Sequence, residues 1–186
     1  MTNRKIDPLR GLVPFAIIVT GLSGLLFFYL YLGHQPVPEV DDLKSEMAEG
    51  FGTVGLWALV VIYGRSLIKL ALNEGTLMQR FIPNEYYDRS LSVSRKFLAT
   101  LNRTHKYVGA AAIVVFACHA LLMGALRWNL FLEMVLVLLA WQGIFGIFLV
   151  IRVPVAAMKR YGYLVHAQLF TGVMIGVFAV FGHLLT

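Results

Sequence analysis

Five apolar segments, each longer than about 20 residues, divide the chain, and the polar and charged residues are concentrated between them. A helix needs roughly 20 apolar residues to cross about 30 Å of hydrocarbon, so each segment has the length of a membrane span. Apolar residues lie on all sides of each segment, which is typical of a fully buried or membrane-spanning helix. The pattern predicts an all-α integral membrane bundle of five transmembrane helices, at residues 11–33, 51–72, 105–126, 129–151 and 161–185.

The composition supports a membrane protein with one domain. The chain is 59% hydrophobic and only 14% charged, whereas soluble domains carry about 25% charged residues. Its 186 residues are too few for two ordinary domains. We therefore expect a single transmembrane domain over residues 1–186, and the lone Cys118 cannot form a disulfide within the chain.

The basic residues between the apolar segments predict the orientation of the chain. Arginine and lysine gather in short cytoplasmic loops of membrane proteins. Residues 34–50 hold five acidic residues and one lysine, whereas seven basic residues lie in and around the connection between the second and third segments. This alternation predicts a cytoplasmic N-terminus and an external C-terminus. It also explains the net charge of +6 without a nucleic-acid partner.

The longest connection spans residues 73–104 and combines apolar residues such as Leu77 and Phe81 with several charges. This mixture is typical of an amphipathic helix that lies on the membrane surface. A solvated loop with one amphipathic turn fits the same pattern. On either interpretation we expect this connection to lie on the inner side of the membrane.

Four histidines lie inside the predicted spans, where an imidazole is costly unless it has a function. His105 and His119 are 14 residues apart, close to four helical turns, so they share one helix face at separate depths. By the predicted orientation, His105 and His166 are both near the inner surface, and His119 and His183 are both near the outer surface. Two imidazoles at each depth predict two haem irons, each with two axial histidines.

The outer histidine pair fits this geometry less well than the inner pair. His166 and His183 are 17 residues apart, which is about 100° away from a shared helix face. A helix irregularity near Gly182 would bring them closer to one face. His34, at the outer end of the first span, is the alternative ligand to His183.

Glycines and basic residues near the histidines add candidate haem contacts. Glycine lets a flat ring approach the backbone closely, and the candidates are Gly109, Gly172 and Gly176. Haem propionates are anionic, and the candidate cations are Arg65, Lys69 and Arg103 for the inner haem and Arg127 for the outer haem. The orientation rule alone also accounts for most of the inner basic residues.

The chain resembles the membrane domains of di-haem b-type cytochromes, including ferric-reductase-like proteins and cytochrome b subunits of membrane dehydrogenases and hydrogenases. The resemblance rests on His105-x13-His119, on His166-x16-His183 and on the segment from Arg103 to Gly109, and it covers mostly residues 103–185. The x16 spacing departs from the ferric-reductase-like pattern. The resemblance implies two haem b groups and electron transfer across a membrane.

The expected partners follow from what the chain lacks. It has no C-x-x-C-H motif for covalent haem attachment, and the five spans leave no room for a flavin- or nicotinamide-binding domain. We therefore expect the haem to be bound non-covalently. We expect the partners to be membrane lipid and other subunits of a redox complex, with a quinone as a further candidate ligand. The expected location is the inner membrane of a bacterium.

Two other functions fit the same spans. In the first, the chain is a non-redox structural or assembly subunit of a membrane complex, and the histidines are packing residues. In the second, it is a small metal-handling transporter, which would want acidic partners inside the spans. Glu133 is the one acidic residue inside a predicted span. Its position fits proton handling at a quinone site, and it also fits a side chain that reaches the membrane interface.

Overall fold

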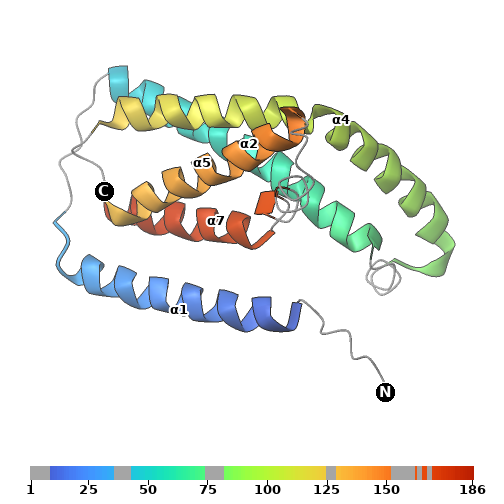
Figure 1. The fold of residues 1–186 in the computed structure, drawn as a ribbon, viewed down its shortest axis with the longest axis horizontal. Coiled ribbons are helices and arrows are strands. Elements are labelled where there is room, and N and C mark those ends of the chain that lie inside the picture. The colour runs from blue at the N-terminus through green and yellow to red at the C-terminus, as the bar shows by residue number, and fades with distance from the viewer. Residues whose placement is uncertain are drawn as a thin grey trace. The chain divides into compact units, whose positions relative to one another are not determined.

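The computed structural model describes residues 9–35, 43–73, 82–124, 129–151, 162, 165–166 and 169–186, and their regular structure is helical (Figure 1). Asn129 starts one helix as an N-cap, because its Oδ1 accepts the backbone N–H groups of Phe131 and Leu132. Another helix ends at Gly124, whose φ of 69° favours glycine. The helices are α1 (Leu9–Leu32), α2 (Leu43–Asn73), α4 (Asn84–Met123), α5 (Leu130–Ile151) and α7 (Leu169–Leu184).

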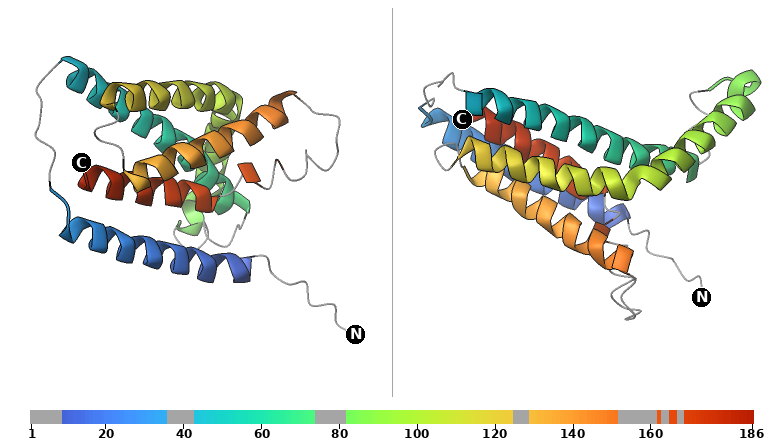
Figure 2. Two further views of the ribbon diagram at one scale, coloured as in Figure 1. Left: turned by 60° about the vertical axis from the view of Figure 1, so that its left-hand side comes forward. Right: turned by 90° about the horizontal axis from the view of Figure 1, so that it is seen from above.

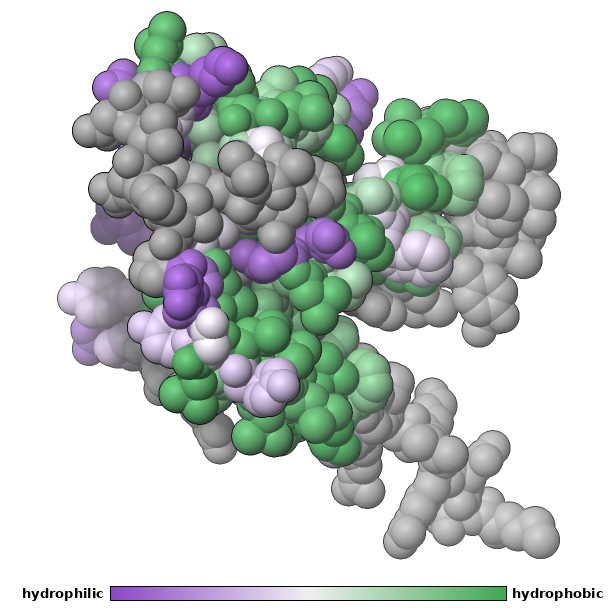
Figure 3. Space-filling view, turned by 90° about the vertical axis from the view of Figure 1, so that its left-hand side faces the viewer, coloured by the Kyte–Doolittle hydropathy of each residue, from purple (hydrophilic) through white to green (hydrophobic). Residues whose placement is uncertain are grey.

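Four of these helices, α1, α2, α4 and α5, are long and apolar enough to cross a membrane. Large apolar side chains reach their surfaces: Leu25 is 69% exposed and Leu121 is 80% exposed. Figure 3 shows the same property as broad apolar areas on the described face, with polar side chains confined to patches. Such surfaces suit lipid, so the helices indicate a multi-pass membrane protein.

The fifth predicted span is described only in part. We expected a helix over residues 161–185, whereas α7 has 16 residues, Leu169–Leu184. Residues 162, 165 and 166 are also helical. The other residues between 161 and 168 lie outside the described part of the chain, so the predicted start of this span is not tested.

The boundary predicted at residue 105 is not a helix boundary. The residues from Asn84 onward are helical, as a surface helix predicts, but they continue without a break into the third span. The resulting 40-residue helix is about 60 Å long, twice the hydrocarbon thickness. The second span also begins earlier than predicted, at Leu43, where Glu46 lies in the first turn and interacts favourably with the helix dipole.

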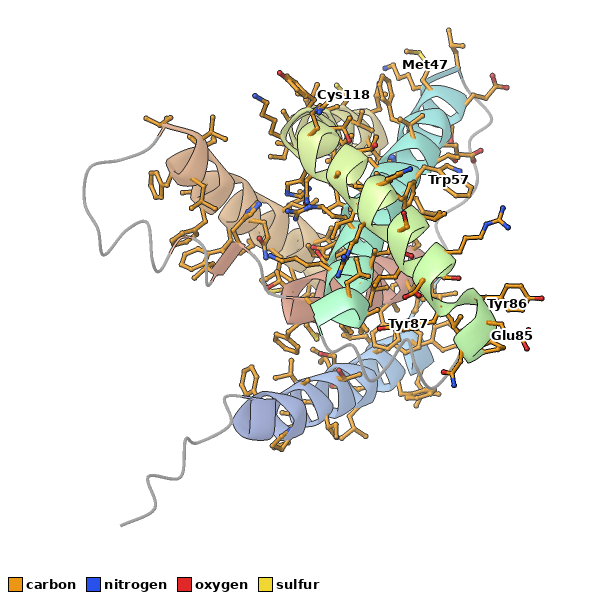
Figure 4. The ribbon with its side chains drawn as sticks, turned by 90° about the vertical axis from the view of Figure 1, so that its right-hand side faces the viewer. Met47, Trp57, Glu85, Tyr86, Tyr87 and Cys118 are labelled. Carbon is orange, nitrogen blue, oxygen red and sulfur yellow. The ribbon has the colours of Figure 1, made fainter. Side chains whose placement is uncertain are left out.

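The α4 helix changes direction near its middle (Figure 2). Two threonines lie there, one turn apart: Thr100 donates its hydroxyl to the Lys96 carbonyl and Thr104 donates to the Thr100 carbonyl. Hydroxyl groups that bond back to the preceding turn often bend helices. In Figure 4, Glu85 and Tyr86 project outward from the beginning of α4, and Cys118 lies near its other end.

The chain divides into two compact units, and α5 contributes to both. The first unit comprises Met1–Glu39, Arg127–Leu138 and Phe170–Thr186, and the second comprises Val40–Leu126 and Leu139–Leu169. In the first unit, Phe27, Phe131 and Leu185 form a buried apolar cluster. The Phe27 and Phe181 rings stack with their centroids 4.5 Å apart.

In the second unit, α2 and α4 pack side by side (Figure 1). A Cβ atom placed on Gly52 would lie 3.0 Å from the His119 ring, and one placed on Gly55 would lie 2.9 Å from the Phe116 ring. Rising numbers on α2 therefore meet falling numbers on α4, so the two helices are antiparallel. Glycine is typical of helix contacts in membranes, because it lets backbones approach closely.

Candidate functional site

The structure brings together His105 and His166, the predicted inner pair, which are 61 residues apart in the sequence. Their ring centroids are 5.8 Å apart and the ring planes are inclined by 67°. A metal held between two imidazole nitrogens, with bonds of about 2 Å, puts the ring centroids roughly 6 Å apart. The distance is close to the one expected if both imidazoles held one metal, and it also lies in the range of an ordinary edge-to-face ring contact.

Gln142 on α5 holds the segment that carries His166. The His166 Nδ1–H donates to the Gln142 backbone oxygen at 3.0 Å. The Gln142 side-chain Nε2 donates to the Val165 oxygen at 3.4 Å. Because a carbonyl can only accept, Nδ1 carries a proton, and in the neutral imidazole Nε2 keeps its lone pair. His166 therefore presents Nε2 as a metal-binding atom.

His105 is held differently from His166. Within the described part of the chain, its Nδ1 is buried without a hydrogen-bond partner. Arg65 on α2 is close enough for its charge to act on His105, and its Nε donates to the Asn102 Oδ1 at 2.6 Å. A buried, unpaired imidazole nitrogen is unfavourable. The Nδ1 of His105 therefore remains available to bind a ligand, as far as the described protein groups are concerned.

His119, the predicted outer ligand on α4, lies against α2. Its Nδ1–H donates to the Ala48 oxygen at 2.7 Å. A Cβ on Gly52 would lie 3.0 Å from its Cε1 and 3.2 Å from its Nδ1. As at His166, the acceptor is a carbonyl, so Nε2 keeps the lone pair.

The contacts of His119 and His166 follow one pattern. Each ring donates to the carbonyl of a residue on a neighbouring helix and packs against the glycine four residues further along that helix. We call this arrangement a carbonyl–glycine notch. The two notches are Ala48/Gly52 on α2 and Gln142/Gly146 on α5, and a Cβ on Gly146 would lie 2.9 Å from the His166 Cε1.

The second outer ligand remains a prediction. His183 lies on α7 in the first unit, where its Nδ1–H donates to the Ala179 oxygen of the same helix at 2.7 Å. His34 follows α1 in a turn, with its backbone N–H donating to the Tyr31 oxygen. His119 belongs to the second unit, so neither choice of partner is tested.

The predicted auxiliary residues have different surroundings. Arg65 and Lys69 are half-buried on α2, and Arg103 is exposed on α4. No described atom lies within 4 Å of a Cβ placed on Gly109 or Gly176, so both leave space beside the backbone. Gly172 lies in α7, and Arg127 lies outside the described residues.

Two further residues have plain structural surroundings. Glu133 is exposed in the first turn of α5, where the helix dipole favours a negative charge. Cys118 is half-buried and free. Among the described residues, no group of three or more His, Cys, Asp or Glu side chains is placed to hold a metal ion.

The sequence reasoning missed Gly52, Gly146 and the carbonyls of Ala48 and Gln142. It considered only glycines on the helices that carry the histidines, whereas these glycines lie on the facing segments. A signal was present: Gly52/Gly55 and Gly143/Gly146 are glycine pairs three residues apart inside apolar spans. Small residues inside apolar spans are typical of helix contacts in membranes.

No known protein family, curated protein or solved structure matches this chain. The resemblance to di-haem b-type cytochromes therefore rests on the histidines and their surroundings alone, and it remains a prediction.

Proposed function

We propose that this chain is the di-haem b-type cytochrome subunit of a redox complex and carries electrons across the inner membrane of a bacterium. In this proposal the N-terminus is cytoplasmic, and a quinone or a partner redox subunit exchanges electrons with the chain. The observation that carries the proposal is the meeting of His105 and His166, with ring centroids 5.8 Å apart, from distant parts of the sequence. When bound, haem iron supplies reversible one-electron transfer.

The residues around the inner pair suit haem in three respects. His166 offers Nε2, because its Nδ1 is engaged, and His105 has an unpaired buried nitrogen among the described residues. The space beside Gly109, one turn from His105, is not filled by described protein atoms. Arg65 bonds to Asn102, three residues before His105, and supplies a cation of the kind that pairs with a propionate.

Two imidazoles suit haem better than a bare metal ion. Haem brings four nitrogens of its own and needs only axial ligands from the protein. A tetrahedral zinc site takes about four ligands, at least three of them from the protein. The described residues hold no group of three or more such ligands, so the inner pair supports the haem proposal over a metal-handling transporter.

One observation favours a structural or assembly subunit as the second candidate. His119, His166 and His183 all donate to backbone carbonyls, and a histidine that only joins helices would make the same bonds. The two functions differ in whether the Nε2 atoms of these histidines bind haem iron.

Haem spectra of the purified protein, expressed with ample haem, separate the two functions. We expect a b-type spectrum with two haems per chain. His105→Ala and His166→Ala should each remove the inner haem, and His119→Ala should remove the outer one. Loss of one haem in His183→Ala and retention of both in the matched variant His34→Ala would assign the last ligand. A wild-type protein without haem would overturn the proposal and favour the structural role.

A further inference from the structure

The two carbonyl–glycine notches have a common physical cause. Side chains of a helix point back towards its N-terminus, so the side chain of residue i+4 covers the carbonyl of residue i. Glycine has no side chain and leaves that carbonyl open from the side. Gly52 thereby uncovers the Ala48 oxygen and Gly146 uncovers the Gln142 oxygen, and these are the oxygens that accept the histidine Nδ1–H groups.

We infer that Gly52 and Gly146 are positioning residues for His119 and His166. Each glycine opens a notch that fixes its histidine as the Nδ1–H tautomer, with Nε2 as the coordinating atom. The inference rests on the proposed function, and it adds that each predicted haem receives one notch-held ligand: His166 at the inner haem and His119 at the outer haem. A carbonyl bonded to the second nitrogen orients a metal-binding histidine and raises its basicity.

An alanine at either notch would act in two ways. Its methyl group would lie 3.0 Å from the Cε1 of His119 or 2.9 Å from the Cε1 of His166, so the ring must shift. It would also cover the carbonyl that the Nδ1–H group needs. Loss of a partner of this kind typically weakens metal binding about 10- to 100-fold.

The chain supplies a matched control for each notch. A Cβ on Gly55 would lie 2.9 Å from the Phe116 ring, and a Cβ on Gly143 would lie 2.8 Å from the Ile113 Cδ1. These contacts are as tight as those at the notches, on the same helices, but the side chains are apolar. A general loss of helix packing would therefore appear in Gly55→Ala, which meets a ring, as strongly as in Gly52→Ala. At Gly143 the contact is the end of the flexible Ile113 side chain, so Gly143→Ala controls for an added methyl group on α5.

Nitrogen NMR of labelled histidine in the haem-free protein tests the notches directly. We expect His119 and His166 to be Nδ1–H tautomers, with their signals assigned by His119→Ala and His166→Ala. Gly52→Ala should change only the His119 signals and Gly146→Ala only those of His166. An Nε2–H tautomer in the wild type, or equal changes in the control variants, would overturn the inference.

Haem titration tests the use of the notches as ligand supports. Gly146→Ala should weaken the inner haem, and Gly52→Ala the outer haem, by about 10-fold or more, with a shifted reduction potential, and the control variants should stay near the wild type. If the wild type binds two haems and the notch variants equal it, the inference is wrong while the proposed function stands. If the wild type binds no haem, the proposed function is wrong, and NMR still decides whether the glycines position the rings.

Discussion

In the first unit aromatic rings pack against one another between the helices, whereas in the second unit large side chains pack against glycines of the neighbouring helix. Phe27 stacks on Phe181 at 4.5 Å, and Phe131 meets Phe181 edge to face at 5.6 Å. In the second unit, Phe116 and His119 lie against two glycines of α2.

The two packing modes differ in what they do to the backbone. Where rings lie between helices, as at Phe27 and Phe181, the contact is apolar. The first unit also has one close glycine contact, at Gly182, whose oxygen accepts from the Asn129 Nδ2. Glycine contacts bring backbones close and uncover carbonyl oxygens, which a polar side chain can use. Three of the five histidines, His105, His119 and His166, belong to the second unit, so the predicted chemistry lies mainly where the backbones approach.

The largest expected effect on haem content comes from replacing a histidine of the second unit by phenylalanine, the residue that packs between the helices of the first unit. His166→Phe keeps a ring of similar size and removes the coordinating nitrogen. We expect loss of the inner haem, while the haem-free protein loses about 0.5–1.5 kcal/mol in its free energy of unfolding, because the bond to the Gln142 oxygen is removed. Haem content and denaturation in mixed micelles measure the two quantities. Full retention of both haems would show that the histidine pair does not bind haem.

A glycine contact inside the first unit should be the next most sensitive position. A Cβ on Gly182 would lie 2.5 Å from the Leu132 Cδ2, so Gly182→Ala should destabilise the protein by about 1–3 kcal/mol through overpacking. Gly176→Ala on the same helix is the matched control, because its Cβ would meet no described atom within 4 Å. The control should be neutral or stabilising in haem-free protein, and equal losses in both variants would contradict the contact.

Truncation of the buried ring at Phe131 should cost less than the same change in a soluble protein. Phe131 is 2% exposed, and Phe→Ala in soluble cores typically costs about 3–5 kcal/mol. In lipid the transfer contribution is nearly absent, so we expect about 2 kcal/mol from the cavity alone. The haem spectrum should stay unchanged, and loss of the inner haem in this variant would remove the functional contrast between the units.

The N-cap of α5 should have a smaller effect. Asn129→Ala removes the cap of α5 and the bond from its Nδ2 to the Gly182 oxygen at 2.9 Å. A lost cap costs about 1 kcal/mol, and Asn129→Asp, which keeps the cap oxygen, should recover part of it. Thermal unfolding of the pair measures the difference, and identical stability of both variants with the wild type would contradict the capping role.

The smallest effect is expected on the lipid-facing surface. Leu25 is 69% exposed, and its substitution by alanine exchanges one apolar surface for another in lipid. We expect a change within about 0.5 kcal/mol and an unchanged spectrum. A loss above 1 kcal/mol, roughly the scale of a lost cap, would indicate that this side of α1 packs against protein.

Much of the local structure was predictable from the sequence. Apolar runs predicted the fourth span as residues 129–151, and α5 is Leu130–Ile151. The continuous helix from Asn84 to Met123 was missed, because hydropathy reports where apolar residues end and a helix can continue beyond them. The start of α2 at Leu43 was missed for the same reason.

The candidate site divides in the same way. The sequence by itself determined that four imidazoles lie in apolar helices, because burial cost and helical spacing are local properties. Only the tertiary structure decided that His166 lies beside His105 and on Gly146, and that His119 lies on Gly52. These contacts join residues far apart in the chain, and their geometry depends on how closely two helix backbones approach. A glycine permits a close approach, but it does not specify which residue will lie against it.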